Sequence, residues 1–101
     1  MYDVVIIGGG PAGASAAIIT AKAGKKTLVI DSDQSVTKRA WIDNHYGTEG
    51  ISGPDLVASG KRQAIKFGAE FVTAKATKIV AGDGSVSVET DGQSYEGSHV
   101  I

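Results

Sequence analysis

The pattern of apolar and polar positions divides the chain into two parts of different character. The first part begins with apolar runs at residues 2–7 and 27–30, separated by an alanine-rich stretch over 11–23. Short apolar runs that end at glycine or a charged residue are typical of strands buried on both faces. A strand, a glycine turn, a helix and a second strand within about thirty residues form a βαβ unit. We therefore predict such a unit over residues 2–31, with parallel strands and a right-handed crossover.

The middle of the chain alternates between an irregular stretch and a second helix and strand. Residues 32–52 show no clear periodicity, and we interpret them as the long loop of the molecule. A helix is predicted over 53–68, with Ser52 as its N-cap, Pro54 in its first turn and Gly68 at its end. Residues 70–74 then predict a third parallel strand.

The last part of the chain has the pattern of short antiparallel strands. Residues 77–81, 85–90 and 94–101 are strand-like, and Val86 and Val88 alternate with polar neighbours. These stretches are separated by Gly82-Asp83-Gly84 and by Asp91-Gly92. Such glycine turns are typical of hairpins, so residues 77–101 predict an antiparallel β-meander. The whole chain, 1–101, is expected to form one doubly wound α/β domain. Its Rossmann-like half has parallel strands in the order 3-2-1, with the meander inserted.

Composition and charge exclude several classes of protein. Apolar residues make up 42% of the chain and the net charge is -1, which favours a globular fold and gives no support to nucleic-acid binding. The uncharged stretch 4–21 approaches membrane-spanning length, but glycines and Pro11 interrupt it, so we expect no membrane segment. The chain has no cysteine, which fits the reducing cytoplasm. Its two histidines form no recognisable metal site, and we expect none.

The glycines of the first turn have the spacing of a nucleotide-binding fingerprint. Gly8, Gly10 and Gly13 form G-x-G-x-x-G between a predicted strand and a predicted helix. The first glycine permits the tight turn, the second lets the backbone approach a pyrophosphate, and the third lets helix and strand pack closely. Pro11 suits the first turn of the helix, whose free N–H groups and positive dipole end face the phosphates. The turn therefore predicts a site for an adenine dinucleotide.

Asp31 supplies the second half of this fingerprint. It closes the second predicted strand about twenty residues beyond the last glycine, where a carboxylate accepts hydrogen bonds from ribose hydroxyls. An acid at this position disfavours a 2′-phosphate, and so disfavours NADPH as the ligand of this turn. The spacing alone does not separate FAD from NAD.

Longer stretches resemble one family, the thioredoxin-reductase-like, FAD-dependent pyridine nucleotide oxidoreductases. "DVVIIGGGPAGASAA" is similar to their N-terminal FAD fingerprint, and "DNHYG" stands where they have an Asn-aromatic-Pro-Gly turn near the flavin. "ISGPDLVASGKRQAIKFGAEF" is similar to their second helix and third strand, and "GDGSVSVETDGQSYEGSHVI" to their meander. The resemblance covers nearly the whole chain.

The resemblance implies an enzyme part. The glycine turn would hold the pyrophosphate of FAD, NAD(P)H would be the electron donor from a separate domain, and Asn44 would lie close to the flavin. The chain has no C-x-x-C, so we expect an electron acceptor, not yet identified, that is not a dithiol. Relatives continue beyond residues 98–101, so we expect the N-terminal portion of a flavoprotein that associates with a missing C-terminal portion or forms a homo-oligomer. The candidate cofactor-binding residues are Gly8, Gly10, Pro11, Ala12, Gly13, Asp31, Ser32, Lys38, Asn44 and His45.

Two other functions and two ambiguous side chains stay open at this point. The chain can be a non-catalytic module that binds NAD or another adenine nucleotide. It can also be a ligand-free structural fragment that associates through an open sheet edge at its first or last strand. His45 lies either near the flavin ring or in a solvated loop. Lys38 either neutralises pyrophosphate or forms a solvated basic pair with Arg39.

Overall fold

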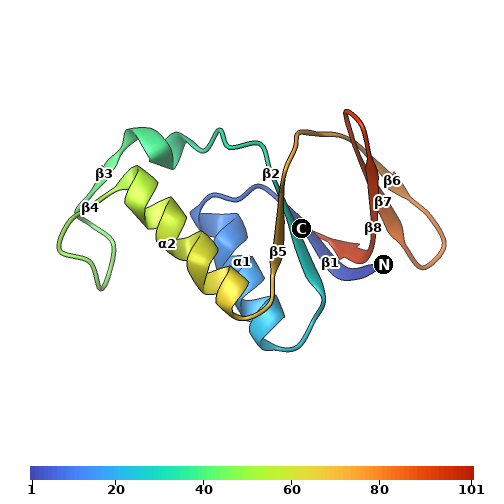
Figure 1. Cartoon of the computed structure of the whole chain (residues 1–101), viewed down its shortest axis with the longest axis horizontal. Coiled ribbons are helices and arrows are strands. Elements are labelled where there is room, and N and C mark those ends of the chain that lie inside the picture. Colours follow the sequence, from blue (N-terminus) through green and yellow to red (C-terminus); the bar gives the residue numbers. More distant parts are fainter.

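The computed structural model describes all residues, 1–101, as a six-stranded sheet, two long helices and a small separate hairpin. The first half contains β1 (Tyr2–Ile7), α1 (Pro11–Lys22), β2 (Thr27–Asp31), the 3-10 helix η1 (Val36–Arg39), β3 (Trp41–Ile42) and β4 (Ile51–Ser52). The second half contains α2 (Gly53–Lys66), β5 (Glu70–Thr73), β6 (Ala76–Ala81), β7 (Val86–Thr90) and β8 (Ser94–Val100). Figure 1 shows their arrangement.

The parallel part of the sheet has the predicted order. The sheet runs β5-β2-β1-β8-β7-β6, so the first three parallel strands are ordered 3-2-1. β1 pairs with β2 in a register that places Val5 opposite Leu28, and β2 pairs with β5 in a register that places Val29 opposite Phe71. The prediction of a Rossmann-like arrangement is confirmed in this part.

The pairing of β8 differs from the prediction. Its first half pairs antiparallel with β7, as expected of a meander, but its second half pairs parallel with β1, with His99 opposite Val4. Residue Gly97 belongs to both pairings, and a Cβ there would lie 2.8 Å from Cγ2 of Val5. The absence of a side chain at Gly97 therefore lets β8 leave the meander and become the fourth parallel strand.

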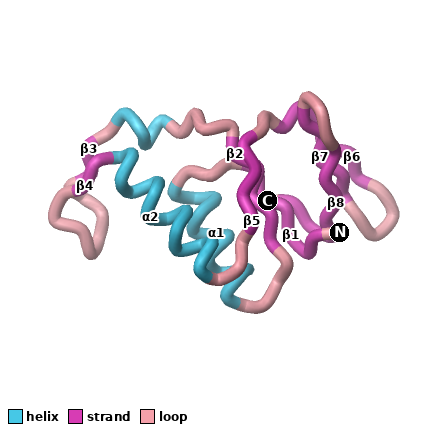
Figure 2. Tube along the Cα trace, viewed as in Figure 1, coloured by secondary structure: helices cyan, strands magenta, loops and turns pink.

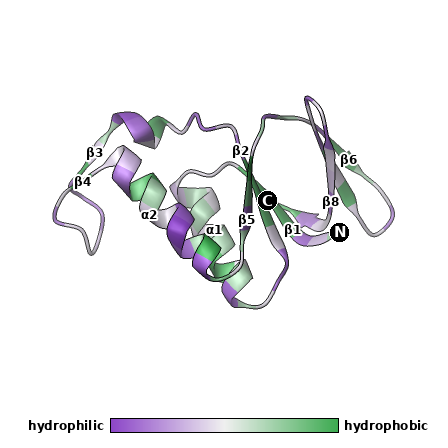
Figure 3. Ribbon diagram, viewed as in Figure 1, coloured by the Kyte–Doolittle hydropathy of each residue, from purple (hydrophilic) through white to green (hydrophobic).

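Because β8 pairs with β1 as well as with β7, the meander packs on one face of the parallel strands, and the molecule has two hydrophobic cores. One face of β1 and β2 packs against both helices in a cluster that contains Val4, Ile6, Ala17 and Ala64. The other face packs against β7 in a cluster of Val5, Leu28, Ile30 and Val88. Figure 1 shows the helices on one side of β5, β2 and β1 and the meander on the other, and Figure 3 shows the apolar colouring of these central strands.

Both helices lie on the same face of the sheet, so the expectation of a doubly wound domain is wrong for this chain. The opposite face is covered by strands, because Val88 of β7 is completely buried there. α1 and α2 also pack closely against each other, since a Cβ on Gly60 would lie 3.3 Å from that of Ala14. The structure therefore has three layers: helices, parallel strands and meander.

The segment 32–52 has more structure than the long loop that the sequence predicts. It contains η1 and the antiparallel pair β3–β4 (Figure 2). Trp41 lies opposite Ser52 in this pair. The Ser35 side chain caps η1 by accepting the N–H of Thr37. Two-residue strands carry too little periodicity to be recognised in a sequence. The Ser52 cap of α2 is observed, because its hydroxyl accepts the N–H of Asp55 at 3.2 Å.

The sheet edges also differ from the expectation. The structural-fragment alternative places an open edge at the first or the last strand, but β1 lies between β2 and β8, and β8 between β1 and β7. The strands at the edges of the sheet are β5 and β6. The helices are too short or too polar for any of them to traverse a lipid bilayer.

Candidate functional site

The glycine turn is held against the end of β2 by two backbone donors. Gly8, with φ of +105°, donates its N–H to the carbonyl oxygen of Ile30 at 2.8 Å. Gly9 donates its N–H to Oδ1 of Asp31 at 3.3 Å. Glycine accepts a positive φ at little cost, which explains its use at position 8. The turn and the end of β2 therefore form one unit.

Three further glycines are needed because no Cβ fits. A Cβ on Gly13 would collide with the carbonyl oxygen of Gly8, so the residue allows α1 to approach the end of β1. A Cβ on Gly9 would lie 2.6 Å from Cγ of Asp31, and one on Gly10 2.9 Å from Oγ of Ser35. The turn is therefore a cradle of bare main chain, bordered by two polar side chains.

The beginning of α1 offers hydrogen-bond donors that the protein does not use. Gly10 is the N-cap and has no capping side chain, and Pro11 has no N–H to place. None of the hydrogen bonds in the structure uses the N–H groups of Gly10, Ala12 or Gly13. Free amides at the positive end of a helix dipole bind anions, phosphates above all.

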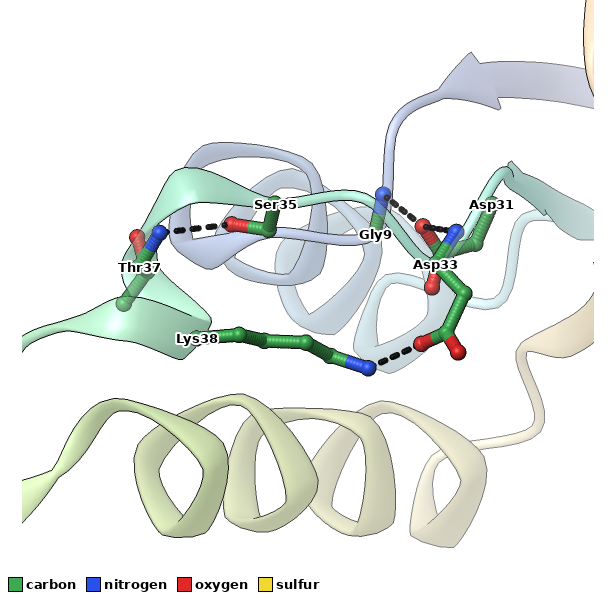
Figure 4. Close-up of polar contacts among 6 residues, drawn as sticks. All are labelled: Gly9, Asp31, Asp33, Ser35, Thr37 and Lys38. Carbon is green, nitrogen blue, oxygen red and sulfur yellow. Dashed lines mark hydrogen bonds and ion pairs between the residues drawn. The ribbon is translucent and has the colours of Figure 1, made fainter.

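Asp31 presents one bonded and one free carboxylate oxygen beside this turn. Its Oδ1 accepts the N–H of Gly9 and also that of Asp33, at 3.0 Å (Figure 4). Its Oδ2 has no hydrogen-bond partner in the protein. The half-buried carboxylate is thus fixed in place with an acceptor left over, which is what binding a ribose hydroxyl requires.

Lys38 is engaged by another side chain of the same loop. Its Nζ forms an ion pair with Oδ1 of Asp33 (Figure 4). This hydrogen bond with Lys38, and then the charges of Lys38 and Lys61, lower the pKa of the Asp33 carboxyl below its ordinary value. Asp33 therefore carries its full negative charge at neutral pH and neutralises Lys38.

A groove extends from the turn between α1 and α2. Its volume is about 320 Å³, and it begins at Gly10 and Pro11 and reaches Asn44 and His45. Apolar side chains of both helices line the groove, among them Ile18. Its polar lining includes Ser15, Thr37, Ser59 and Gln63. The structure thus places Asn44 and His45 in the same groove as the start of α1.

The other predicted residues lie outside this groove. Ser32 lines a smaller cavity of about 160 Å³ together with Gly8 and Ala74. Asp31 and Lys38 line neither this cavity nor the groove. The structure therefore does not bring all the candidate residues together in one cavity.

Sequence reasoning missed three residues that border the turn. Gly9 touches the Asp31 carboxylate, Asp33 donates to it, and Ser35 lies against Gly10. The run of three consecutive glycines was a usable signal for Gly9, because the middle residue must also lack a side chain. Nothing in the local pattern distinguishes Asp33 or Ser35 from other polar residues of a loop.

The fold and this turn define a class of protein: Rossmann-like domains with a glycine cradle for a dinucleotide. The model of the family described as "Pyridine nucleotide-disulphide oxidoreductase" matches residues 2–101. The chain belongs to this family, and the predicted likeness to thioredoxin reductases is confirmed.

Individual relatives agree with this assignment. The thioredoxin reductase of Aquifex aeolicus is 42% identical over 100% of this chain and 33% of its own length. The structure of a thioredoxin reductase from Streptococcus pyogenes matches with a TM-score of 0.95 and 33% identity, over 100% of this chain and 34% of its own. The structure of an atypical thioredoxin reductase from Desulfovibrio vulgaris Hildenborough matches with a TM-score of 0.91 and 39% identity, over 100% of this chain and 35% of its own. The chain spans about a third of the length of these relatives, and it has their Rossmann-like FAD-binding fold.

Proposed function

We propose that this chain is the FAD-binding portion of a flavin-dependent oxidoreductase of the thioredoxin-reductase type. The observation that carries the proposal is the cradle at the start of α1. The amides of Gly10, Ala12 and Gly13 have no hydrogen-bond partner in the protein. The turn that carries them is bare main chain, because a Cβ on Gly9, Gly10 or Gly13 would collide with neighbouring atoms. Bare backbone with unused donors fits a pyrophosphate, which carries negative charge and several acceptor oxygens.

The remaining residues fit the two halves of the cofactor. Asp31, whose Oδ2 is free, would accept a hydroxyl of the adenosine ribose. Ser32 follows it and lines the smaller cavity with Gly8. Pro11 borders the groove in which Asn44 and His45 would contact the flavin half.

The redox chemistry would come from the cofactor. When bound, FAD would take up a hydride from NAD(P)H and pass the two electrons to an acceptor. This chain would bind and orient the cofactor. It has no cysteine, so no dithiol of these 101 residues accepts the electrons. The nicotinamide nucleotide and the acceptor would be bound by the further portion with which this chain associates, in the cytoplasm.

The experiment is a titration of FAD with the chain, in which binding is measured by the quenching of flavin fluorescence. We expect saturable binding that weakens at least about tenfold in Gly10→Val, because the added Cβ would lie 2.9 Å from Oγ of Ser35 and would displace the turn from the loop beside it. Gly92→Val is the matched control, since a Cβ at Gly92 has no atom within 4 Å. If the chain binds NAD saturably and does not bind FAD, it is a nucleotide-binding module and the proposal is wrong. Self-association with neither ligand bound would replace it by the structural fragment.

A further inference from the structure

Asp33 has a backbone conformation that no other residue with a side chain adopts in this structure. Its φ is 64°, and every other positive φ belongs to a glycine. A residue with a Cβ adopts this left-handed conformation at a cost, and the conformation persists only where its surroundings hold it. Asp33 lies two residues beyond Asp31, in the connection between β2 and η1.

The N–H of Asp33 lies on the nucleotide-site carboxylate and closes a short turn that begins at Asp31. Asp33 donates to Oδ1 of Asp31 at 3.0 Å, and Gly9 donates to the same oxygen at 3.3 Å. Oδ2 receives no donor from the protein. Two donors on one oxygen fix the rotation of the carboxylate and leave the other oxygen for a ligand (Figure 4).

The side chain of Asp33 acts on the nearby cation. Its carboxylate holds the ammonium group of Lys38, and Lys61 is the other cation that acts on it. A free basic residue beside the ribose carboxylate is the feature that accommodates a 2′-phosphate in dinucleotide sites. With Lys38 engaged by Asp33, this lysine is not free to take that role.

We propose that Asp33 is a positioning residue that makes this site selective for an adenine nucleotide with a free 2′-hydroxyl. Its backbone N–H orients Asp31, and its carboxylate keeps Lys38 engaged. The inference rests on the proposed function, because it takes the turn at residues 8–13 to hold an adenine dinucleotide. It adds the device that sets the specificity of the ribose.

The backbone role is tested without any ligand, by hydrogen exchange of the Gly9 amide. Asp33→Gly keeps the backbone N–H and accepts a positive φ. Asp33→Val also keeps the N–H, but its branched side chain disfavours a positive φ at this position. We expect protection of Gly9 to persist in the glycine variant and to fall about tenfold in the valine variant, because Asp31 is then released. The amide of Val5, at the buried centre of β1, reports global unfolding. Asp33→Ala replaces the valine variant if the latter does not fold, and unchanged Gly9 protection in the folded variant would overturn the role.

The charge role is tested by displacing bound FAD with two probes, AMP and adenosine 2′,5′-bisphosphate. Asp33→Asn tolerates the left-handed conformation and removes the charge, so it frees Lys38. We expect the preference to shift about tenfold toward the bisphosphate, and to return to the wild-type ratio in Asp33→Asn/Lys38→Met. An unchanged ratio in Asp33→Asn overturns the specificity role. If the wild-type chain binds no FAD, the proposed function fails, while the exchange experiment still decides whether Asp33 positions Asp31.

Discussion

In the proposed function, the adenosine side of the site depends on the carboxylate of Asp31. One of its oxygens accepts the amides of Gly9 and Asp33, and the other is free. A side chain held in this way loses little conformational freedom when it binds, so a hydrogen bond from a ribose hydroxyl would contribute fully to affinity. The same bonds also fasten the loop after β2 to the glycine turn.

Replacing Asp31 separates its role in binding from its role in the fold. A hydrogen bond to a charged group contributes about 1.5–3 kcal/mol, so Asp31→Ala should weaken FAD binding about tenfold to a hundredfold. The flavin fluorescence titration measures this change, and far-UV circular dichroism serves as the check on folding. FAD affinity equal to that of the wild-type chain would exclude Asp31 from the site.

Tyr2 is a residue outside the site whose ionisation reports on the sheet. Its hydroxyl donates to the carboxylate of Glu70, and this bond, partial burial and the charge of Glu70 raise the pKa of Tyr2 to about 12. The bond links β1 to β5 across β2, which lies between them. Because the folded pKa exceeds the ordinary value of 10.0, the contribution to stability is complete below pH 10 and is lost as the pH rises to about 12.

Alkaline titration of tyrosine absorbance tests this statement. We expect the wild-type chain to show a step near pH 12 that is missing in Tyr2→Phe. Tyr46→Phe is the matched control, because Tyr46 is fully exposed, and it should keep the step. If Tyr46→Phe removes the step and Tyr2→Phe does not, the bond between Tyr2 and Glu70 is not present in solution.

The contrast between Asp31 and Asp33 shows how far the sequence predicts the site. Asp31 was predictable, because its place follows from a strand, a helix and a second strand of ordinary length. The role of Asp33 depends on a hydrogen bond within an irregular segment and on a positive φ, which aspartate tolerates but does not by itself predict. Lys38 has a partner five positions earlier in an irregular segment, so its pairing was equally beyond prediction.

Among the elements, β8 decides how the two halves of the chain join. It leaves β7 and pairs with β1 at Gly97, where an added Cβ would lie 2.8 Å from Cγ2 of Val5. The sequence of residues 94–101 predicted a strand but not its second partner. Hydrophobic periodicity is local, whereas pairing between β1 and β8 joins the two ends of the chain.

A methyl group at Gly97 tests this crossing. Gly97→Ala places a Cβ 2.8 Å from Cγ2 of Val5, and overpacking of this kind costs about 1–3 kcal/mol of stability. Gly92→Ala is the control, because a Cβ there meets nothing within 4 Å. Urea unfolding of both variants compares the two positions. Equal midpoints for Gly97→Ala and the wild-type chain would contradict the observed approach of β8 to β1.

At the scale of the whole molecule, the three layers leave the nucleotide turn at the end of the parallel strands. Helices cover one face of these strands and the meander covers the other (Figure 1). Ligands of open α/β sheets bind outside the carboxyl ends of the strands, which is where β1 and β2 end beside the turn. The chain matches about a third of its relatives, and that third contains the complete glycine cradle.

The most direct test of this account is a map of amide chemical shifts while FAD is added to the chain. The account predicts that the largest changes occur at Gly10, Ala12 and Gly13, whose N–H groups have no partner in the protein, and at Asp31. Addition of ADP should reproduce the changes on the Asp31 side of the turn. Saturating FAD that leaves these amides unchanged, or that shifts signals only in another part of the chain, would contradict it.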